Sequence, residues 1–152
     1  MPYMEVGQFK GKPILRELVD RAVGIEINFG PNGYGTVHGD KVLEAFSPLQ
    51  KVIRGEWLVP FLVVVQPGGI LPYHRDFPEP ITGQVRYHLV LQSNPDCWSW
   101  HDHQWQQLKS GWLYTMEPSK YHSSVNFGSE DRIHFVVDIL EPNRTSAAKA
   151  AV

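Results

Sequence analysis

The stretch that decides the fold runs Gln84-Val85-Arg86-Tyr87-His88-Leu89-Val90-Leu91-Gln92. Because strand side chains alternate between the two faces of a sheet, Arg86 and His88 share one face and the apolar side chains at 87, 89 and 91 share the other. A second stretch, Arg132-Ile133-His134-Phe135-Val136-Val137-Asp138-Ile139, repeats this pattern. The two stretches predict two strands that each turn one apolar face to the core and one polar face to a lined space.

The chain contains 12 Pro and 13 Gly, which favour frequent turns, as in all-β domains. Residues 13–23 carry apolar side chains at helical spacing, which predicts an amphipathic helix that covers one face of a sheet. Residues 42–46 and 51–54 fit either a short helix or a strand. Further strands are predicted at 57–66, 97–100, 104–108, 112–116 and 121–126. The fold class predicted is mostly β, a double-stranded β-helix (a cupin-like jelly roll) with an N-terminal helical cover.

The length of 152 residues predicts one domain, with the catalytic double-stranded β-helix at about 57–140 and a frayed tail at 143–152. The formal charge of −2, from 14 basic and 16 acidic residues, argues against a nucleic-acid partner. Cys97 is the single cysteine, so an intramolecular disulfide and a cysteine-rich zinc site are excluded. No signal peptide is recognisable, and the longest apolar run is too short to span a bilayer. We expect a soluble cytoplasmic protein without a membrane partner.

The chemistry is predicted to centre on His74 and Asp76, in the run Gly68-Gly69-Ile70-Leu71-Pro72-Tyr73-His74-Arg75-Asp76. In an extended backbone the imidazole and the carboxylate point the same way, and they form two thirds of the facial triad that holds non-haem Fe(II). We assign His122 as the third ligand. Such a site leaves three iron positions open, two for a chelating keto acid and one for O2, and Arg132 is placed to pair the far carboxylate of that acid.

These residues lie in blocks of sequence that carry a resemblance. The blocks are Arg86-Tyr87-His88-Leu89-Val90-Leu91, Gly111-Trp112-Leu113-Tyr114, His122-Ser123-Ser124-Val125-Asn126 and the stretch from Arg132 to Asp138, together with His74-x-Asp76. In their order and spacing, over about residues 57–140, the chain resembles the aspartyl/asparaginyl β-hydroxylase family of 2-oxoglutarate-dependent oxygenases. The best-known animal members have a glycine where this chain has Asp76, so this chain departs from them by keeping the carboxylate.

The resemblance implies a double-stranded β-helix that uses Fe(II), 2-oxoglutarate and O2. It implies that His74 and His122 bind iron, that Arg132 binds the distal carboxylate of 2-oxoglutarate, and that Arg86 and His88 lie near a co-substrate or substrate carboxylate. The reaction implied is oxidative decarboxylation of 2-oxoglutarate coupled to C–H hydroxylation. The chain is short, as in small microbial members of the family, some of which hydroxylate free amino acids such as proline. The resemblance leaves the individual substrate open, and the class of substrate predicted is a free amino acid or an amino-acid side chain in a peptide.

Three further assignments come from the sequence. His134 and Trp112 are placed at the substrate rim, although a core role for His134 fits the pattern equally. The pair His101-x-His103 is a competing metal pair, interpreted as an exposed hairpin tip, and Arg75 is expected to face away from the metal. Two other functions stay open: a cupin-like metal enzyme that does not use 2-oxoglutarate, and a non-catalytic ligand-binding jelly roll.

Overall fold

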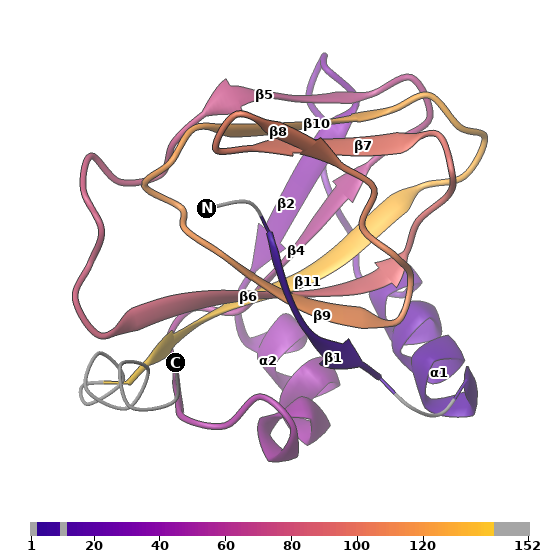
Figure 1. The fold of residues 1–152 in the computed structure, drawn as a ribbon. Coiled ribbons are helices and arrows are strands. Elements are labelled where there is room, and N and C mark those ends of the chain that lie inside the picture. Colours follow the sequence, from indigo (N-terminus) through magenta and orange to yellow (C-terminus); the bar gives the residue numbers. More distant parts are fainter. Residues whose placement is uncertain (1–2, 10–11, 142–152) are drawn as a thin grey trace.

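The computed structural model describes residues 3–9 and 12–141, and the predicted tail at 143–152 lies outside them. Two antiparallel sheets face one another, and the two α-helices lie beneath the larger sheet, on the side away from the smaller one (Figure 1). Within the described residues, no helix is long and apolar enough to cross a membrane.

The helical elements are α1 (Lys12–Val23), α2 (Asp40–Phe46) and the 3-10 helix η1 (Ser47–Lys51). The strands are β1 (Met4–Gln8), β2 (Tyr34–His38), β3 (Glu56–Trp57), β4 (Phe61–Val65), β5 (Ile70–His74), β6 (Gln84–Gln92), β7 (Cys97–His101), β8 (Gln104–Gln106), β9 (Trp112–Met116), β10 (His122–Asn126) and β11 (Arg132–Leu140).

The sheet topology is that of a jelly roll. The larger sheet has the order β1-β9-β6-β11-β4-β2, with β3 added on β11, and the smaller sheet has the order β5-β10-β7-β8. Strand β11 lies near the middle of the larger sheet, between β6 and β4. The predicted fold class is therefore confirmed, with α1 and α2 as the helical cover.

The alternation predicted for β6 and β11 is confirmed, and it positions the core. The odd-numbered side chains of β11 from Ile133 to Ile139 and Leu89 and Leu91 of β6 join the main apolar cluster on the helical side of the sheet. Phe135 is fully buried and stacks on Phe46 of α2, with ring centroids 4.8 Å apart. Truncation of such a phenylalanine to alanine typically costs about 3–5 kcal/mol, so the helical cover and the sheet stabilise one another.

Other expectations are settled differently. Residues 42–46 are helical and 51–54 do not form a strand, whereas the strand predicted at 57–66 is divided into β3 and β4. Strands β1 and β2, at the two ends of the larger sheet, have no counterpart in the sequence-based prediction. The interpretation of His101 as part of an exposed hairpin tip is wrong, because His101 is the last residue of β7 and is fully buried.

Candidate active site

A cavity of about 620 Å³ lies between the two sheets. Its walls combine the polar face of β6 and β11 with side chains from β2, β4, β5 and β10 and from the loop that follows β5. The lining residues that carry the argument below are Tyr3, His74, Asp76, Arg86, His88, His122 and Arg132. One cavity therefore holds all six residues predicted to bind the metal and the co-substrate.

The start of β5 is fixed by two glycines that meet. A Cβ on Gly69 would lie 2.5 Å from the carbonyl oxygen of Gly33, so any side chain there would force the two backbones apart. The same contact is closed by backbone hydrogen bonds from Gln66 to Gly33 and from Ile70 to Asn32, both 2.8 Å. This junction sets where β5 begins and hence where His74 ends it.

The three metal-ligand candidates come from neighbouring strands. His74 ends β5 and lies directly opposite His122, which begins β10, so both imidazoles project from the same face of the smaller sheet. Asp76 lies in the loop that follows β5, and its backbone N–H donates to the carbonyl oxygen of Pro118, 2.9 Å away. Each of the three residues offers a ligand atom, and these atoms lie within 4.8 Å of one another.

The ring orientation of both histidines suits a metal. His74 Nδ1 is 2.6 Å from the Pro72 carbonyl oxygen, and His122 Nδ1 is 2.8 Å from that of Lys120. A carbonyl oxygen only accepts, so each Nδ1 carries a proton, and Nε2 is the ring nitrogen that faces Asp76 and can bind a metal. These Nε2 atoms lie 3.5 and 3.4 Å from the two carboxylate oxygens of Asp76. Backbone acceptors that fix the tautomer are a general feature of histidines that bind metals.

The charges around Asp76 keep it ionised. Burial alone would raise the pKa of its carboxyl group, but hydrogen bonds from His122 and His74 and the charge of Arg86 outweigh burial and hold that pKa well below its usual range. The hydrogen bond to Asp76 in turn raises the pKa of His74, against the effect of partial burial. A carboxylate that stays ionised beside two imidazoles is a donor set that fits Fe(II), which uses two histidines and one carboxylate.

Arg86 is tied to two carboxylates. Its Nε and Nη2 donate to the two oxygens of Asp138 at 2.8 and 3.0 Å, and its Nη1 donates to Asp76 at 2.5 Å. Asp138 lies directly opposite Arg86 on β11 and also accepts from Gln84. The guanidinium thus fixes the orientation of Asp76, which is a different contact from the co-substrate carboxylate expected from the sequence.

Arg132 has the opposite surroundings. It is 2% exposed, and its hydrogen bond to Ser99 Oγ is 3.3 Å long. No carboxylate among residues 3–9 and 12–141 forms an ion pair with it, and burial lowers its pKa. Ser124 lies opposite Ser99 on the neighbouring strand β10. Its buried hydroxyl has no hydrogen-bond partner among the described residues. A buried cation with one long hydrogen bond, near one buried hydroxyl without a partner, fits an anionic ligand, since such a charge is costly when left unpaired.

His88 lines the cavity, and its Nδ1 lies 3.1 Å from Nδ1 of the buried His134. One Nδ1 must donate and the other accept, so one ring carries its proton on Nδ1 and the other on Nε2. Both Nε2 atoms are buried without a partner in the described chain. Burial lowers the pKa of both rings well below the usual range, helped by the charge of Arg132. The two histidines are therefore neutral hydrogen-bonding groups.

The predicted rim residues lie elsewhere. Neither His134 nor Trp112 is among the residues that line the cavity. The Nζ atom of Lys109 lies 5.0 Å above the ring of Trp112. Trp112 packs against a small apolar cluster formed by Tyr3, Val90, Leu108, Tyr114 and Met116. The rim role of these two residues thus gains no support from the geometry.

Sequence reasoning missed Tyr3, Ser99 and Asp138 as functional candidates. The alternation of β7 holds the missing signal for Ser99, because Cys97, Ser99 and His101 are all buried whereas Trp98 is exposed. Asp138 had been placed on the polar face of its strand, but its pairing with Arg86 depends on a register that the sequence does not state. Tyr3 lies in a segment without a recognisable pattern.

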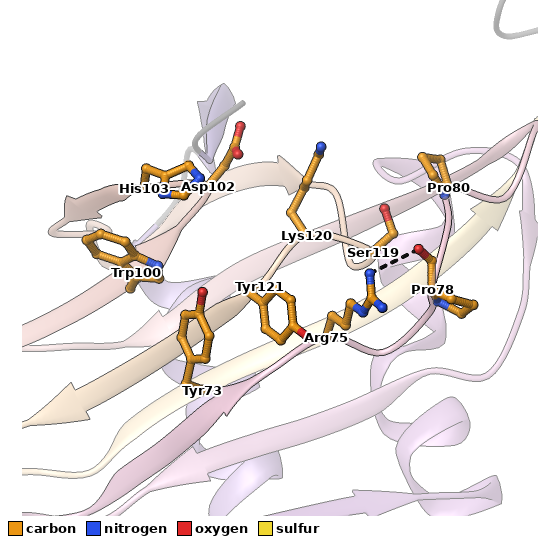
Figure 2. Close-up of a pocket in the computed structure, with 10 residues that line it drawn as sticks. All are labelled: Tyr73, Arg75, Pro78, Pro80, Trp100, Asp102, His103, Ser119, Lys120 and Tyr121. Atoms are coloured by element: carbon orange, nitrogen blue, oxygen red, sulfur yellow. Dashed lines mark hydrogen bonds between the residues drawn. The ribbon is translucent and has the colours of Figure 1, made fainter.

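The outer face of the smaller sheet bears a separate, smaller pocket of about 270 Å³ (Figure 2). Arg75 lies there, as predicted from its place between His74 and Asp76, with its guanidinium 5.2 Å above the ring of Tyr121. Tyr121 also stacks on Tyr73, with centroids 4.7 Å apart and an interplanar angle of 7°. Arg75 Nη1 donates to the Pro78 carbonyl, which secures the loop that follows Asp76 (Figure 2).

The fold and this cluster together define a class: a jelly-roll protein with a candidate site of two histidines and one carboxylate. The family model for aspartyl/asparaginyl β-hydroxylase matches residues 41–142, which is more than half of the chain. The chain belongs to that family, as the sequence blocks predicted. No curated protein sequence matches it.

Solved structures agree on the fold. AviO1 from Streptomyces viridochromogenes Tue57 is 15% identical, with a TM-score of 0.66 over 92% of this chain and 90% of that one. A Pseudomonas putida prolyl-4-hydroxylase is 15% identical, with a TM-score of 0.63 over 91% and 92%. A 2OG-Fe(II) oxygenase family oxidoreductase from Burkholderia pseudomallei is 8% identical, with a TM-score of 0.64 over 88% and 82%. At these identities the likeness establishes the fold alone.

Proposed function

We propose that this chain is an Fe(II)/2-oxoglutarate-dependent dioxygenase that hydroxylates a free amino acid or an amino-acid side chain in a peptide. The observation that carries the proposal is the presence, in one cavity, of the ligand cluster His74, Asp76 and His122 and of a buried arginine, Arg132, that has no carboxylate partner within the described residues. The first feature calls for a metal and the second for an anion. A chelating keto acid with a second carboxylate satisfies both.

In this proposal His74 Nε2, His122 Nε2 and the Asp76 carboxylate hold iron on one face. Iron with 2-oxoglutarate and O2 supplies the oxidation of a C–H bond, which no side chain of the chain can perform. Arg86 keeps the carboxylate of Asp76 in place, and the backbone carbonyls of Pro72 and Lys120 keep both rings in the required tautomer. The chain therefore contributes ligand geometry rather than acid–base catalysis.

The deep end of the cavity binds the distal carboxylate. Arg132 and the hydroxyl of Ser99 supply donors there, and the 2% exposure of Arg132 means that the carboxylate loses its water as it binds. An ion pair formed in such a place is stronger than one at the surface and also more demanding in geometry. This end selects a diacid over a monoacid.

The remaining lining of the cavity is left for the substrate. It is formed by side chains of β2 and β4 and by the loop after Asp76, namely Tyr34, Thr36, His38, Phe61 and Phe77. Hydroxyl, imidazole and aromatic groups in this wall suit a small amino acid or a peptide side chain. The ring of His38 stacks on Phe61 with centroids 4.8 Å apart, so part of this wall is preformed.

The test is an anaerobic titration of the protein with Fe(II) and then 2-oxoglutarate, followed by the visible metal-to-ligand charge-transfer band of the chelate. We expect the band in the wild type and its loss in His122→Ala. In Arg132→Ala the dissociation constant for 2-oxoglutarate should rise about 30-fold or more, while that for the metal stays unchanged.

Absence of the band in a protein that binds metal would overturn the proposal in favour of a cupin-like enzyme that does not use 2-oxoglutarate. Absence of metal binding would favour a non-catalytic jelly roll. Equal loss of metal and 2-oxoglutarate in Arg132→Ala would show that the role assigned to Arg132 is wrong. A panel of amino acids and peptides is then added one at a time, and the compound that stimulates the consumption of 2-oxoglutarate and becomes hydroxylated is the substrate.

A further inference from the structure

The N-terminal strand brings a tyrosine into the cavity. Tyr3 directly precedes β1, is 5% exposed and lines the same cavity as Arg132 and His88. Strand β1 pairs with β9 at the edge of the larger sheet, where Met4 lies opposite Thr115. In Figure 1 the start of β1, drawn in indigo, lies by the space between the two sheets, and the strand runs from there along the edge of the larger sheet.

The backbone of Tyr3 is held by the other sheet. Its N–H donates to Gln106 Oε1 at 2.8 Å, and its carbonyl accepts from Gln106 Nε2 at 3.2 Å. Gln106 belongs to β8 of the smaller sheet. The segment from Tyr3 to Gln8 therefore bridges the two sheets on one side of the cavity, and both backbone hydrogen-bonding groups of Tyr3 are used for this bridge.

Three rings fix the phenol. Tyr3 meets His88 edge to face at 5.5 Å, His101 at 5.2 Å and Tyr114 at 6.5 Å between centroids. A buried tyrosine has an apolar body that fills space and a hydroxyl that needs a polar partner. This packing restricts the ring to one place, so the position of its hydroxyl is preorganised.

The electrostatic surroundings of the phenol are those of the anion end. Burial raises the pKa of Tyr3, against the charges of Arg132 and Arg86, so the hydroxyl keeps its proton and can donate it in a hydrogen bond. Tyr3 and Arg132 line the same cavity, so one ligand bound there can contact both side chains.

We propose that Tyr3 is a binding residue for the diacid co-substrate, whose carboxylate accepts a hydrogen bond from the Tyr3 hydroxyl beside Arg132 and Ser99. The inference rests on the function proposed above. It has a structural consequence: because Tyr3 is the anchor of β1, the bound diacid ties the N-terminal strand to the cavity. The segment of residues 3–9 then acts as a strap whose stability depends on the co-substrate.

The experiment measures binding, not turnover. Calorimetric titration of the Mn(II)-loaded protein with 2-oxoglutarate should give a dissociation constant about 10- to 100-fold higher in Tyr3→Phe than in the wild type, the effect of removing one hydrogen bond to a charged group. The affinity for Mn(II) itself should not change. Tyr3→Phe keeps the ring that fills the space, so the fold is retained.

Tyr114→Phe is the matched control. It removes the same hydroxyl from a buried tyrosine that touches Tyr3, but that hydroxyl accepts a hydrogen bond from the Lys109 N–H and is not part of the cavity wall. We expect its affinity for 2-oxoglutarate to stay within about twofold of the wild type. An equal loss in both variants would mean that packing, rather than the Tyr3 hydroxyl, governs binding and would overturn the inference.

Amide hydrogen exchange provides a second measurement. Addition of 2-oxoglutarate to the Mn(II)-loaded wild type should slow exchange in residues 4–8, and Tyr3→Phe should abolish most of this protection. Wild-type affinity in Tyr3→Phe together with unchanged exchange in β1 would overturn the inference and leave the proposed function intact. Failure of the wild type itself to bind 2-oxoglutarate would overturn both.

Discussion

Arg86 and Arg132 make a comparison within one cavity. Both are buried on the cavity side of the larger sheet, 8% and 2% exposed, and they lie on the adjacent strands β6 and β11. Arg86 is neutralised by Asp138 and Asp76, whereas Arg132 donates to the hydroxyl of Ser99. Desolvation of a charge is costly unless a partner compensates it. The protein supplies that partner at one end of the cavity, and in the proposed function a ligand supplies it at the other.

This difference separates two roles that the sequence assigned together. Both arginines were expected to meet a carboxylate of a small molecule. The contacts of Arg86 with Asp138 and Asp76 instead make it a positioning residue for a candidate metal ligand, so its co-substrate role remains a prediction without geometric support. Burial of an arginine is thus not enough to identify an anion site. The feature that indicates an anion site is the absence of a carboxylate partner for Arg132 within the described residues.

The largest expected effect concerns the compensated end. Asp138→Asn keeps the shape of the side chain but removes one of the two carboxylates that pair with Arg86, so we expect the free energy of unfolding to fall by about 3 kcal/mol, the lower end of the range for a buried ion pair that loses one partner. Urea denaturation of the metal-free protein measures this change. Glu17→Gln is the control, because it breaks the exposed Glu17–Arg21 pair on α1 and should cost less than about 1 kcal/mol. Similar small losses in both variants would contradict the comparison.

The uncompensated end should respond in the opposite direction. Arg132→Met removes a buried charge that has one long hydrogen bond, so we expect the free energy of unfolding of the ligand-free protein to rise by about 1–3 kcal/mol. With metal present, 2-oxoglutarate at 100 times its wild-type dissociation constant should stabilise the wild type by about 2.7 kcal/mol, whereas a dissociation constant about 30-fold higher would limit the gain in the variant to about 0.9 kcal/mol or less. A marked destabilisation of ligand-free Arg132→Met would instead show that the protein already compensates this charge.

Low pH should increase the difference between the two ends of the cavity, because His88 and His134 add positive charge near Arg132 when they are protonated. The folded pKa of each ring is lowered by burial below the value of 6.5 for an ordinary histidine. The unfolded chain therefore binds protons first as pH falls. The stability contributed by the neutral rings is complete above about pH 6.5 and declines below it, by up to about 1.4 kcal/mol per pH unit for each ring.

Urea denaturation of the metal-free protein between pH 7.5 and pH 5 measures this decline. The comparison variant is His134→Gln, which removes one of the two titrating rings and should reduce the slope below pH 6.5. Asp76 does not contribute in this window: its folded pKa is lowered, so its contribution is present above the unfolded value of 3.8 and is lost only below it. Stability that is independent of pH down to 5 would contradict the neutral state of the two rings.

Much of this architecture could be predicted because period-2 alternation is strong where one sheet face is buried. The bounds of β6 and β9 match the prediction residue for residue, and His74, Asp76 and His122 meet as expected. The bond between Arg86 and Asp138 could not be predicted, since it depends on the register of β6 and β11, which shifts between Ile133 and His134. The prediction for His101 was wrong because the polar run His101-Asp102-His103 resembles a loop. The alternation of buried and exposed side chains in β7 nevertheless continues to His101.

The missed edge strands have a different cause. Residues 4–8 are Met-Glu-Val-Gly-Gln, with a glycine in the fourth place and mostly exposed side chains, so their sequence carries little strand propensity. Their conformation comes from pairing with β9 and from the contacts of Tyr3 across the cavity. Tertiary context of this kind is absent from any window of the sequence. The same reason explains why the candidate residue Tyr3 became visible only in the folded chain.

The smallest expected effect belongs to a third arginine, which gives the baseline for the comparison. Arg75 lies on the outer face of the smaller sheet, where it is exposed and stacks over Tyr121 (Figure 2). Arg75→Ala should lower the free energy of unfolding by about 0.5–1 kcal/mol, the usual contribution of an exposed cation–π contact, and should leave 2-oxoglutarate affinity unchanged. Urea denaturation and the Mn(II) calorimetry measure the two quantities, with Arg16→Ala on the exposed face of α1 as control. A clear loss of Mn(II) affinity in Arg75→Ala alone would mean that the hydrogen bond to Pro78 and the stack on Tyr121 hold the loop of Asp76, so that the outer face also shapes the candidate metal site.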